Sequence, residues 1–153
     1  IVHALNELKA AVGDRVILTA GKMHAAGVIS EGGENILTEN DVDAFIDAGA
    51  DILLLPAPGT VPGITMEYAH KLIARAHAKG ALAMTTIGTS QEGADEATIR
   101  EIALMCKMAG ADIHHIGDSG YMGMALPDNI TAYSIAIRGK RHTYRRMAMS
   151  LLR

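Results

Sequence analysis

The sequence predicts an α/β fold of four parallel strand–helix units that form half of a (βα)8 barrel, or TIM barrel. Three short apolar runs begin at Ala50, Ala81 and Ala111, which are 31 and then 30 residues apart. Each run follows a glycine suited to ending a helix and leads into a loop that contains glycine. Nearly continuous apolar runs are typical of strands buried on both faces, as in parallel sheets.

The strands can be assigned in order along the chain. An opening helix over residues 2–12 leads into an earlier copy of the apolar run, which predicts a first strand at 16–20. The three repeated runs predict further strands at 51–56, 82–87 and 112–116.

A helix is expected after each strand, because an N-capping side chain or a proline precedes apolar residues with helical spacing. The caps are Thr38, Thr65 and Asp95, and Pro127 opens the last helix. No linker or low-complexity tract interrupts this order. Residues 1–153 are therefore expected to form a single domain.

Two architectures fit strands and helices that alternate in this way. Both use parallel strands with right-handed crossovers. An open doubly wound sheet would be complete at this length, whereas a whole (βα)8 barrel needs about 250 residues. The regular period and the similar loops favour half of a barrel. Because a half-barrel leaves two strand edges and a concave apolar face uncovered, we expect a homo-oligomer or association with a missing N-terminal half.

Composition favours a cytoplasmic protein with a buried hydrophobic core. Hydrophobic residues make up 49% of the chain and charged residues 20%, so a single domain of this length can bury a core. The one cysteine, Cys106, cannot form an internal disulfide, which suits a reducing compartment. No apolar run has the length of a membrane span, and the N-terminus does not resemble a signal peptide. The chain begins at Ile1, which is consistent with a processed or truncated start.

Charge is unevenly distributed along the chain. All 17 acidic residues lie at or before Asp128, whereas six of the 14 basic residues lie after it. The six are Arg138, Lys140, Arg141, Arg145, Arg146 and Arg153. We expect a terminal helix that docks on an acidic surface of its own protein. Contact with nucleic acid is not expected, because only Tyr144 in this segment offers base stacking.

The loops after the strands carry the candidate chemistry, because active sites of parallel α/β folds lie at the carboxyl ends of the strands. Two short loops after the third and fourth strands combine glycine with hydroxyl side chains, which suits an anion. The residues expected to bind phosphate are Gly88, Thr89, Ser90, Gly117, Ser119 and Gly120. The alternative is a pair of structural turns.

Two neighbouring histidines lie on the fourth strand. Aligning the repeats places His115 with Thr85 and His114 with Met84. Because successive strand residues face opposite sides, one histidine points into the barrel and the other toward the helices. The inward one is a candidate general acid or base, and the sequence does not say which it is. Asp118 is a candidate base or orienting residue, or a loop cap.

Lys22 follows the first strand directly. It is a candidate Schiff-base lysine, or a lysine that binds a carboxylate or phosphate. His24, the next candidate catalytic residue, starts a long glycine-containing loop over residues 25–37. This loop either closes over a ligand or is an ordinary flexible insertion.

No metal site or cofactor is expected. Asp41 and Asp43 have the spacing of the haloacid-dehalogenase phosphatase motif, but they open a helix after Thr38 rather than end a strand. His70 and His77 are seven residues apart and are assigned to a helix surface or to packing.

The strand-end motifs resemble a bacterial family of uncharacterised TIM-barrel proteins, often labelled haloacid dehalogenase-like hydrolase or phosphoenolpyruvate phosphonomutase-like. The motifs are Gly21-Lys22-Met23-His24, Ala57-Pro58-Gly59-Thr60, Ile87-Gly88-Thr89-Ser90-Gln91-Glu92-Gly93, His114-His115-Ile116-Gly117-Asp118-Ser119-Gly120-Tyr121 and the ending 136–146. The resemblance spans essentially all 153 residues and implies a parent of roughly twice this length. This chain would be its C-terminal half. The resemblance implies no activity, because neither the phosphatase motif nor an acidic metal-binding strand end is present.

Two hypotheses follow for function. The first is an enzyme that acts on a phosphorylated or carboxylated small metabolite; lyase, isomerase and hydrolase chemistry remain open, with hydrolysis the least favoured. The second is a non-catalytic barrel that binds such a metabolite as a sensor or assembly partner.

Overall fold

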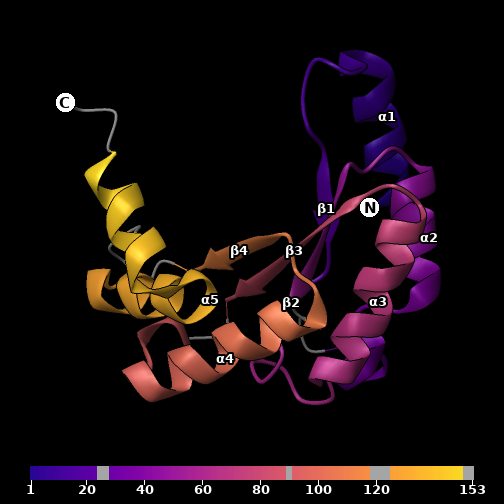
Figure 1. Ribbon diagram of the computed structural model, residues 1–153. Helices are drawn as coiled ribbons and strands as arrows, with labels where there is room; N and C mark the ends of the chain where they lie inside the picture. Colours follow the sequence, from indigo (N-terminus) through magenta and orange to yellow (C-terminus); the bar gives the residue numbers. More distant parts are fainter. Residues whose placement is uncertain (24–27, 89–90, 118–124, 150–153) are drawn as a thin grey trace.

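A computed structural model describes residues 1–23, 28–88, 91–117 and 125–149. Its elements alternate along the chain as predicted (Figure 1). In order they are α1 (Val2–Val12), β1 (Thr19–Gly21), η1 (Ile29–Glu31), η2 (Gly33–Ile36), α2 (Glu39–Asp47), β2 (Ile52–Pro56), α3 (Met66–Ala78), β3 (Leu82–Ile87), η3 (Gln91–Gly93), α4 (Glu96–Ala109), β4 (Ile113–Ile116) and α5 (Pro127–Ala148). The η elements are short 3-10 helices.

The four strands form one parallel sheet in the order β1-β2-β3-β4. A doubly wound sheet would reverse direction at a switch point. The described strands follow the sequential order of a barrel instead, and helices follow each strand. The prediction of four (βα) units arranged as in part of a TIM barrel is confirmed.

The strands are staggered by one residue relative to the sequence repeat. Leu53 pairs with Ala83, and Thr86 pairs with His115, so each register offset is one residue shorter than the sequence period. The repeat alignment that placed His115 with Thr85 is therefore wrong; Thr85 lies opposite His114. The physical reason is the shear of a barrel, because eight strands with a shear of 8 require an average stagger of one residue per strand.

The two faces of the sheet differ in burial. The side chains that face the helices are almost fully buried. They include Ala20, Leu53, Leu55, Ala83, Thr85 and Ile87. On the concave face Ile52, Pro56 and Thr86 are buried, but Met84 and Ile113 are only half-buried and Leu82 is 48% exposed. The core therefore lies between the strands and the helices, as expected when one face of a sheet has no partner.

The first strand differs from its predicted span. It covers Thr19–Gly21 rather than 16–20, and Ile17 is 73% exposed. The carboxylate of Asp51, just before β2, accepts the Leu18 amide at 2.8 Å. Because this side chain takes the place of a backbone partner, the ladder with β2 begins only at Thr19.

The predicted helix caps are confirmed. Thr38 and Asp41 form a reciprocal capping box at the start of α2. The Thr65 hydroxyl accepts the Tyr68 amide at 3.1 Å, and the Asp95 carboxylate accepts the Thr98 amide at 2.8 Å. Each cap satisfies an amide that the first helical turn leaves without a partner.

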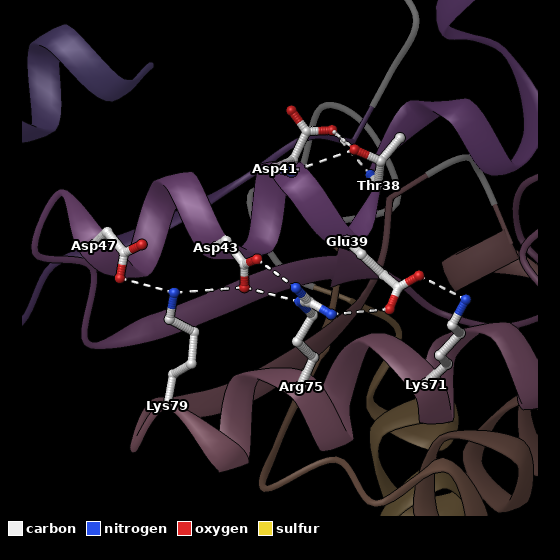
Figure 2. A network of polar contacts seen from close by, with 8 residues as sticks. All are labelled: Thr38, Glu39, Asp41, Asp43, Asp47, Lys71, Arg75 and Lys79. Atoms are coloured by element: carbon white, nitrogen blue, oxygen red, sulfur yellow. Dashed lines mark hydrogen bonds and ion pairs between the residues drawn. The ribbon is translucent and has the colours of Figure 1, made fainter.

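An ionic network joins α2 to α3 (Figure 2). Arg75 bonds Asp43 and Glu39, Lys71 pairs with Glu39, and Lys79 pairs with Asp43 and Asp47. The hydrogen bond from Arg75 lowers the pKa of Asp43 to about 2. Glu39, Asp43 and Asp47 of α2 are thus paired with basic side chains of α3 and of Lys79, the residue that follows it.

The basic C-terminal segment does not dock on the acidic surface as expected. A kink at Gly139, with φ of 80°, divides α5, and the described residues beyond it, 140–149, are exposed apart from Thr143. Among the described residues no ion pair involves Arg138, Lys140, Arg141, Arg145 or Arg146. Glu39, Asp43 and Asp47 of α2 already have basic partners in Lys71, Arg75 and Lys79, so these carboxylates do not require the C-terminal segment. No helix in the described ranges is long and apolar enough to cross a membrane.

We predict that the 153-residue chain expressed by itself forms a dimer or larger species, because its concave face leaves apolar surface in water. Light scattering should give at least twice the chain mass. Met84→Asp on the concave face should shift the chain toward monomer. The matched control, Leu104→Asp on the outer surface of α4, should leave the mass unchanged. A cooperatively folding wild-type monomer would contradict the prediction.

Candidate functional site

His115 lies on the concave face near the carboxyl end of β4. Its Nδ1 lies 2.7 Å from the hydroxyl of Thr86, which is on the neighbouring strand β3. Thr86 is only 3% exposed, whereas His115 is exposed. A hydroxyl can donate or accept, so this contact fits either neutral tautomer of the imidazole. The ring is therefore held in place while Nε2 has no described protein partner, the arrangement that a general acid or base requires.

His114 points the other way, into the layer between sheet and helices. Its Nδ1 lies 3.1 Å from the hydroxyl of Tyr133 on α5, and the two rings meet edge to face with centroids 5.5 Å apart. Burial lowers the pKa of His114, and the positive charge of Arg138 adds to this effect. The structure therefore assigns packing to His114 and leaves His115 as the histidine on the concave face.

The two predicted phosphate glycines have different surroundings. The amide of Gly117 already donates to the Ile87 carbonyl at 2.9 Å. A Cβ at Gly117 would lie 2.7 Å from that carbonyl oxygen and 3.3 Å from the carboxyl carbon of Glu92. The amide of Gly117 is therefore not free to bind an anion in this arrangement. The Ile87 carbonyl and the Glu92 carboxyl lie where a side chain would be. At Gly88 the one contact that a Cβ would make within the described ranges is with the flexible end of the Met23 side chain, at 3.1 Å.

Glu92 was not identified as a site residue from the sequence. It lies in η3, directly after the β3 loop, and is only 7% exposed. None of the described residues forms a hydrogen bond with its Oε2 atom. In the sequence, its place inside a strand-end motif was the one sign that Glu92 lies near the site. The composition of that loop does not predict that the side chain is buried.

Lys22 follows β1 and turns toward the helix side of the sheet. Its ammonium lies 3.1 Å from Asp41 of α2, and both side chains are 22% exposed. Burial opposes ionisation of Asp41, but hydrogen bonds from Thr38 and Lys22 outweigh it and lower the pKa of Asp41. A Schiff-base lysine must be a neutral nucleophile. An ion-paired lysine directed away from the concave face fits a charge-pairing role instead.

A cavity of about 730 Å³ adjoins this ion pair. It is lined by Ile1, Val2, His3, Gly21, Lys22, Met23, Asp41 and Phe45. Asp41 lies inside α2 and so does not have the strand-end position that phosphatase chemistry requires, as the sequence predicted.

Several predicted site residues lie outside the described parts of the chain. They are His24, Thr89, Ser90, Asp118, Ser119 and Gly120. Of the remainder, Gly88, His115 and Gly117 come together at the ends of the adjacent strands β3 and β4, whose last residues Ile87 and Ile116 are paired.

The described ranges contain no group of three or more metal-ligating side chains. His70 instead contacts the Ala109 carbonyl at 3.0 Å, and His77 pairs with Asp112 at 2.7 Å. Both contacts join α3 to neighbouring elements and account for these histidines as packing residues.

The fold and the strand-end groups define a partial (βα)8 barrel with a candidate small-molecule site on its concave face. The chain belongs to the family described as a domain of unknown function, DUF7916, whose model matches residues 1–153. No curated protein matches the sequence.

Among solved structures, the chain is similar to a tetrameric deoxyribose phosphate aldolase from Aeropyrum pernix, with a TM-score of 0.64 and 15% identity. The match covers 90% of this chain and 56% of that chain, so this chain spans about half of the aldolase. At this identity the likeness supports the TIM-barrel fold alone. Neither match names a haloacid dehalogenase or a phosphonomutase, so those labels gain no support.

We predict that His114 makes the fold sensitive to mild acid. Its folded pKa lies below the ordinary 6.5, so its contribution to stability is present above pH 6.5 and is lost as pH falls through the folded value. His114→Phe keeps the ring and should flatten the dependence between pH 7.5 and 5 in urea unfolding. His142→Phe, at an exposed position of α5, is the control and should keep the wild-type slope. Equal slopes in all three proteins would refute this origin.

A second prediction separates the two glycines. Gly117→Ala should lower the free energy of unfolding by about 1–3 kcal/mol, because its Cβ collides with backbone. Gly88→Ala should cost less, since the Met23 side chain can move aside. Urea denaturation compares them, and a Gly88→Ala variant that is the less stable of the two would show this reasoning to be wrong.

Proposed function

We propose that this chain supplies the C-terminal half of a (βα)8-barrel enzyme that acts on a phosphorylated or carboxylated small metabolite. The observation that carries the proposal is His115, exposed on the concave face and anchored by Thr86 at the carboxyl ends of the strands. This end of a parallel barrel is where active sites form.

The single cysteine, Cys106, is buried and free, which supports a reducing, cytoplasmic setting.

His115 is the proposed acid–base group. In one tautomer the Thr86 hydroxyl accepts from Nδ1 and leaves a lone pair on Nε2, which can remove a proton from the metabolite. In the other the hydroxyl donates to Nδ1, and Nε2 carries the proton to be returned. The same contact therefore supports both steps of a proton transfer. This chemistry favours an isomerase or lyase over a hydrolase.

The anion of the metabolite is proposed to bind at the loop that begins with Gly88 and continues through Thr89 and Ser90. Gly88 is half-buried, and among the residues that the structure describes a Cβ placed there would meet the end of the Met23 side chain alone, which supports approach of a ligand to this backbone. Ser119 and Gly120 are proposed to complete the site from the next loop. The aldolase with a similar fold acts, by its name, on a phosphorylated sugar, which guides the choice of substrates below.

The test measures turnover of a panel of sugar phosphates and phosphorylated keto acids by the full-length protein. His115→Gln should lower kcat by about 10²- to 10⁴-fold with little change in KM, and remove one limb of the pH profile. Thr86→Val should lower kcat less, by about tenfold, because the ring loses only its anchor. His142→Gln, an exposed histidine on α5, is the matched control.

Three outcomes are informative. Turnover that depends on His115 supports the enzyme. Binding of these metabolites without turnover favours the second function, a metabolite-binding barrel. The absence of both binding and turnover for every metabolite of the panel would overturn the proposal.

A further inference from the structure

The end of α5 carries a concentrated positive charge. Its exposed cations are in no ion pair with another described residue, and they are Arg138, Lys140, Arg141, Arg145 and Arg146. Lys107 of α4 adds a further cation beside the kink, because its ammonium donates to the Ile137 carbonyl at 2.9 Å. The sequence has no acidic residue after Asp128, so no neighbour along the chain offsets this charge.

The same segment exposes apolar side chains in a fixed orientation. Tyr144 is 54% and Met147 59% exposed, and their spacing of three places them on one side of the helix. Thr143 is buried, and its hydroxyl lies 3.0 Å from that of Ser134 across the kink. This contact holds the helix end in the direction in which it leads away from α4 (Figure 1). A helix that exposes apolar anchors beside cations is suited to docking in a groove of a partner.

A groove of complementary chemistry lies between α4 and the loop before α3. Its volume is about 740 Å³, and its apolar walls are formed by Val61, Pro62, Ile64, Met66, Met105 and Met108. Leu104 of α4 does not line it. Methionine side chains adapt to the shape of a partner, which makes them common at binding surfaces. The loop itself is held in place, because the Thr60 hydroxyl donates to the Ala57 carbonyl at 2.7 Å and the Gly59 amide donates to the Ile64 carbonyl at 3.3 Å.

The charge at this groove is negative. Glu67 lines it, and Glu101 is exposed on α4 one turn before Met105. Neither carboxylate is in an ion pair with another described residue, and no described basic side chain lines the groove. The groove lies outside β2 and β3, the inner strands of the sheet, so strands added at the edges of β1 or β4 would leave it open.

We propose that the end of α5, residues 140–149, docks in this groove of a second copy of the protein. Tyr144 and Met147 pack against the methionines of the groove. Arg141 and Arg145, four residues apart on the neighbouring side of the helix, face its carboxylates. The basic segment thus meets an acidic surface of the same kind of protein, but on another copy. The contact is independent of the chemistry proposed for His115.

A charge exchange tests the contact in the full-length protein by sedimentation equilibrium. A helix variant, Arg141→Glu with Arg145→Glu, and a groove variant, Glu67→Lys with Glu101→Lys, should each raise the Kd of self-association about tenfold or more. All four changes in one chain should restore most of the affinity, because the reversed charges are again complementary. Glu7→Lys, at an exposed position of α1, is the control and should leave the Kd unchanged.

Cross-linking locates the contact. A carbodiimide joins a lysine to a carboxylate that touches it, so Lys140 should be joined to Glu67 or Glu101. In an equal mixture of isotopically light and heavy protein, joined peptides with one light and one heavy half show that the link is between copies. Lys140→Arg keeps the charge and should remove this link without raising the Kd.

Each alternative result overturns the proposal. A full-length protein that stays monomeric, including one whose α5 binds RNA or anionic vesicles instead, has no such contact. Association that neither charge variant weakens uses another surface. A loss caused by the helix variant alone, or a link from Lys140 to carboxylates outside residues 1–153, places the helix end elsewhere.

Discussion

The stagger of the parallel ladder is the constraint on which the rest of this structure depends. Side chains alternate between the two faces of a strand, so a shift of one residue exchanges every inward and outward position. Thr86 opposes His115, and Thr85 opposes His114. That register assigns one histidine to the concave face with a hydroxyl anchor and the other to Tyr133 in the helix layer.

The charged side chains also differ between the concave face of the sheet and the outer surface of the helices. The outer surface of α2 and α3 neutralises itself through Arg75, Lys71 and Lys79, so the acidic excess of the sequence produces few unpaired charges there. Lys22 joins this outer system through Asp41. The concave face instead holds His115 and the hydroxyl of Thr86, and these are groups suited to proton transfer rather than to ion pairing.

Glycine at position 117 illustrates how one residue type serves different purposes. Both strand-end glycines suit a loop in which backbone approaches an anion. At Gly117 the Ile87 carbonyl and the Glu92 side chain lie where a Cβ would be. At Gly88 a Cβ would contact the flexible Met23 side chain and no other described residue. Strand-end loops that look equivalent in sequence therefore differ in what they can bind, and Glu92 supplies part of the difference.

The sequence by itself determined the fold class, the order of the elements, three strands to within a residue and the caps at Thr38, Thr65 and Asp95, because each depends on local patterns of apolar, capping and glycine residues. Only the tertiary structure decided which histidine faces the concave side, where β1 begins, that Lys22 pairs with Asp41, and that Glu92 is buried. These features depend on register and on contacts between residues far apart in the chain, and a one-residue stagger leaves no local signature in the sequence.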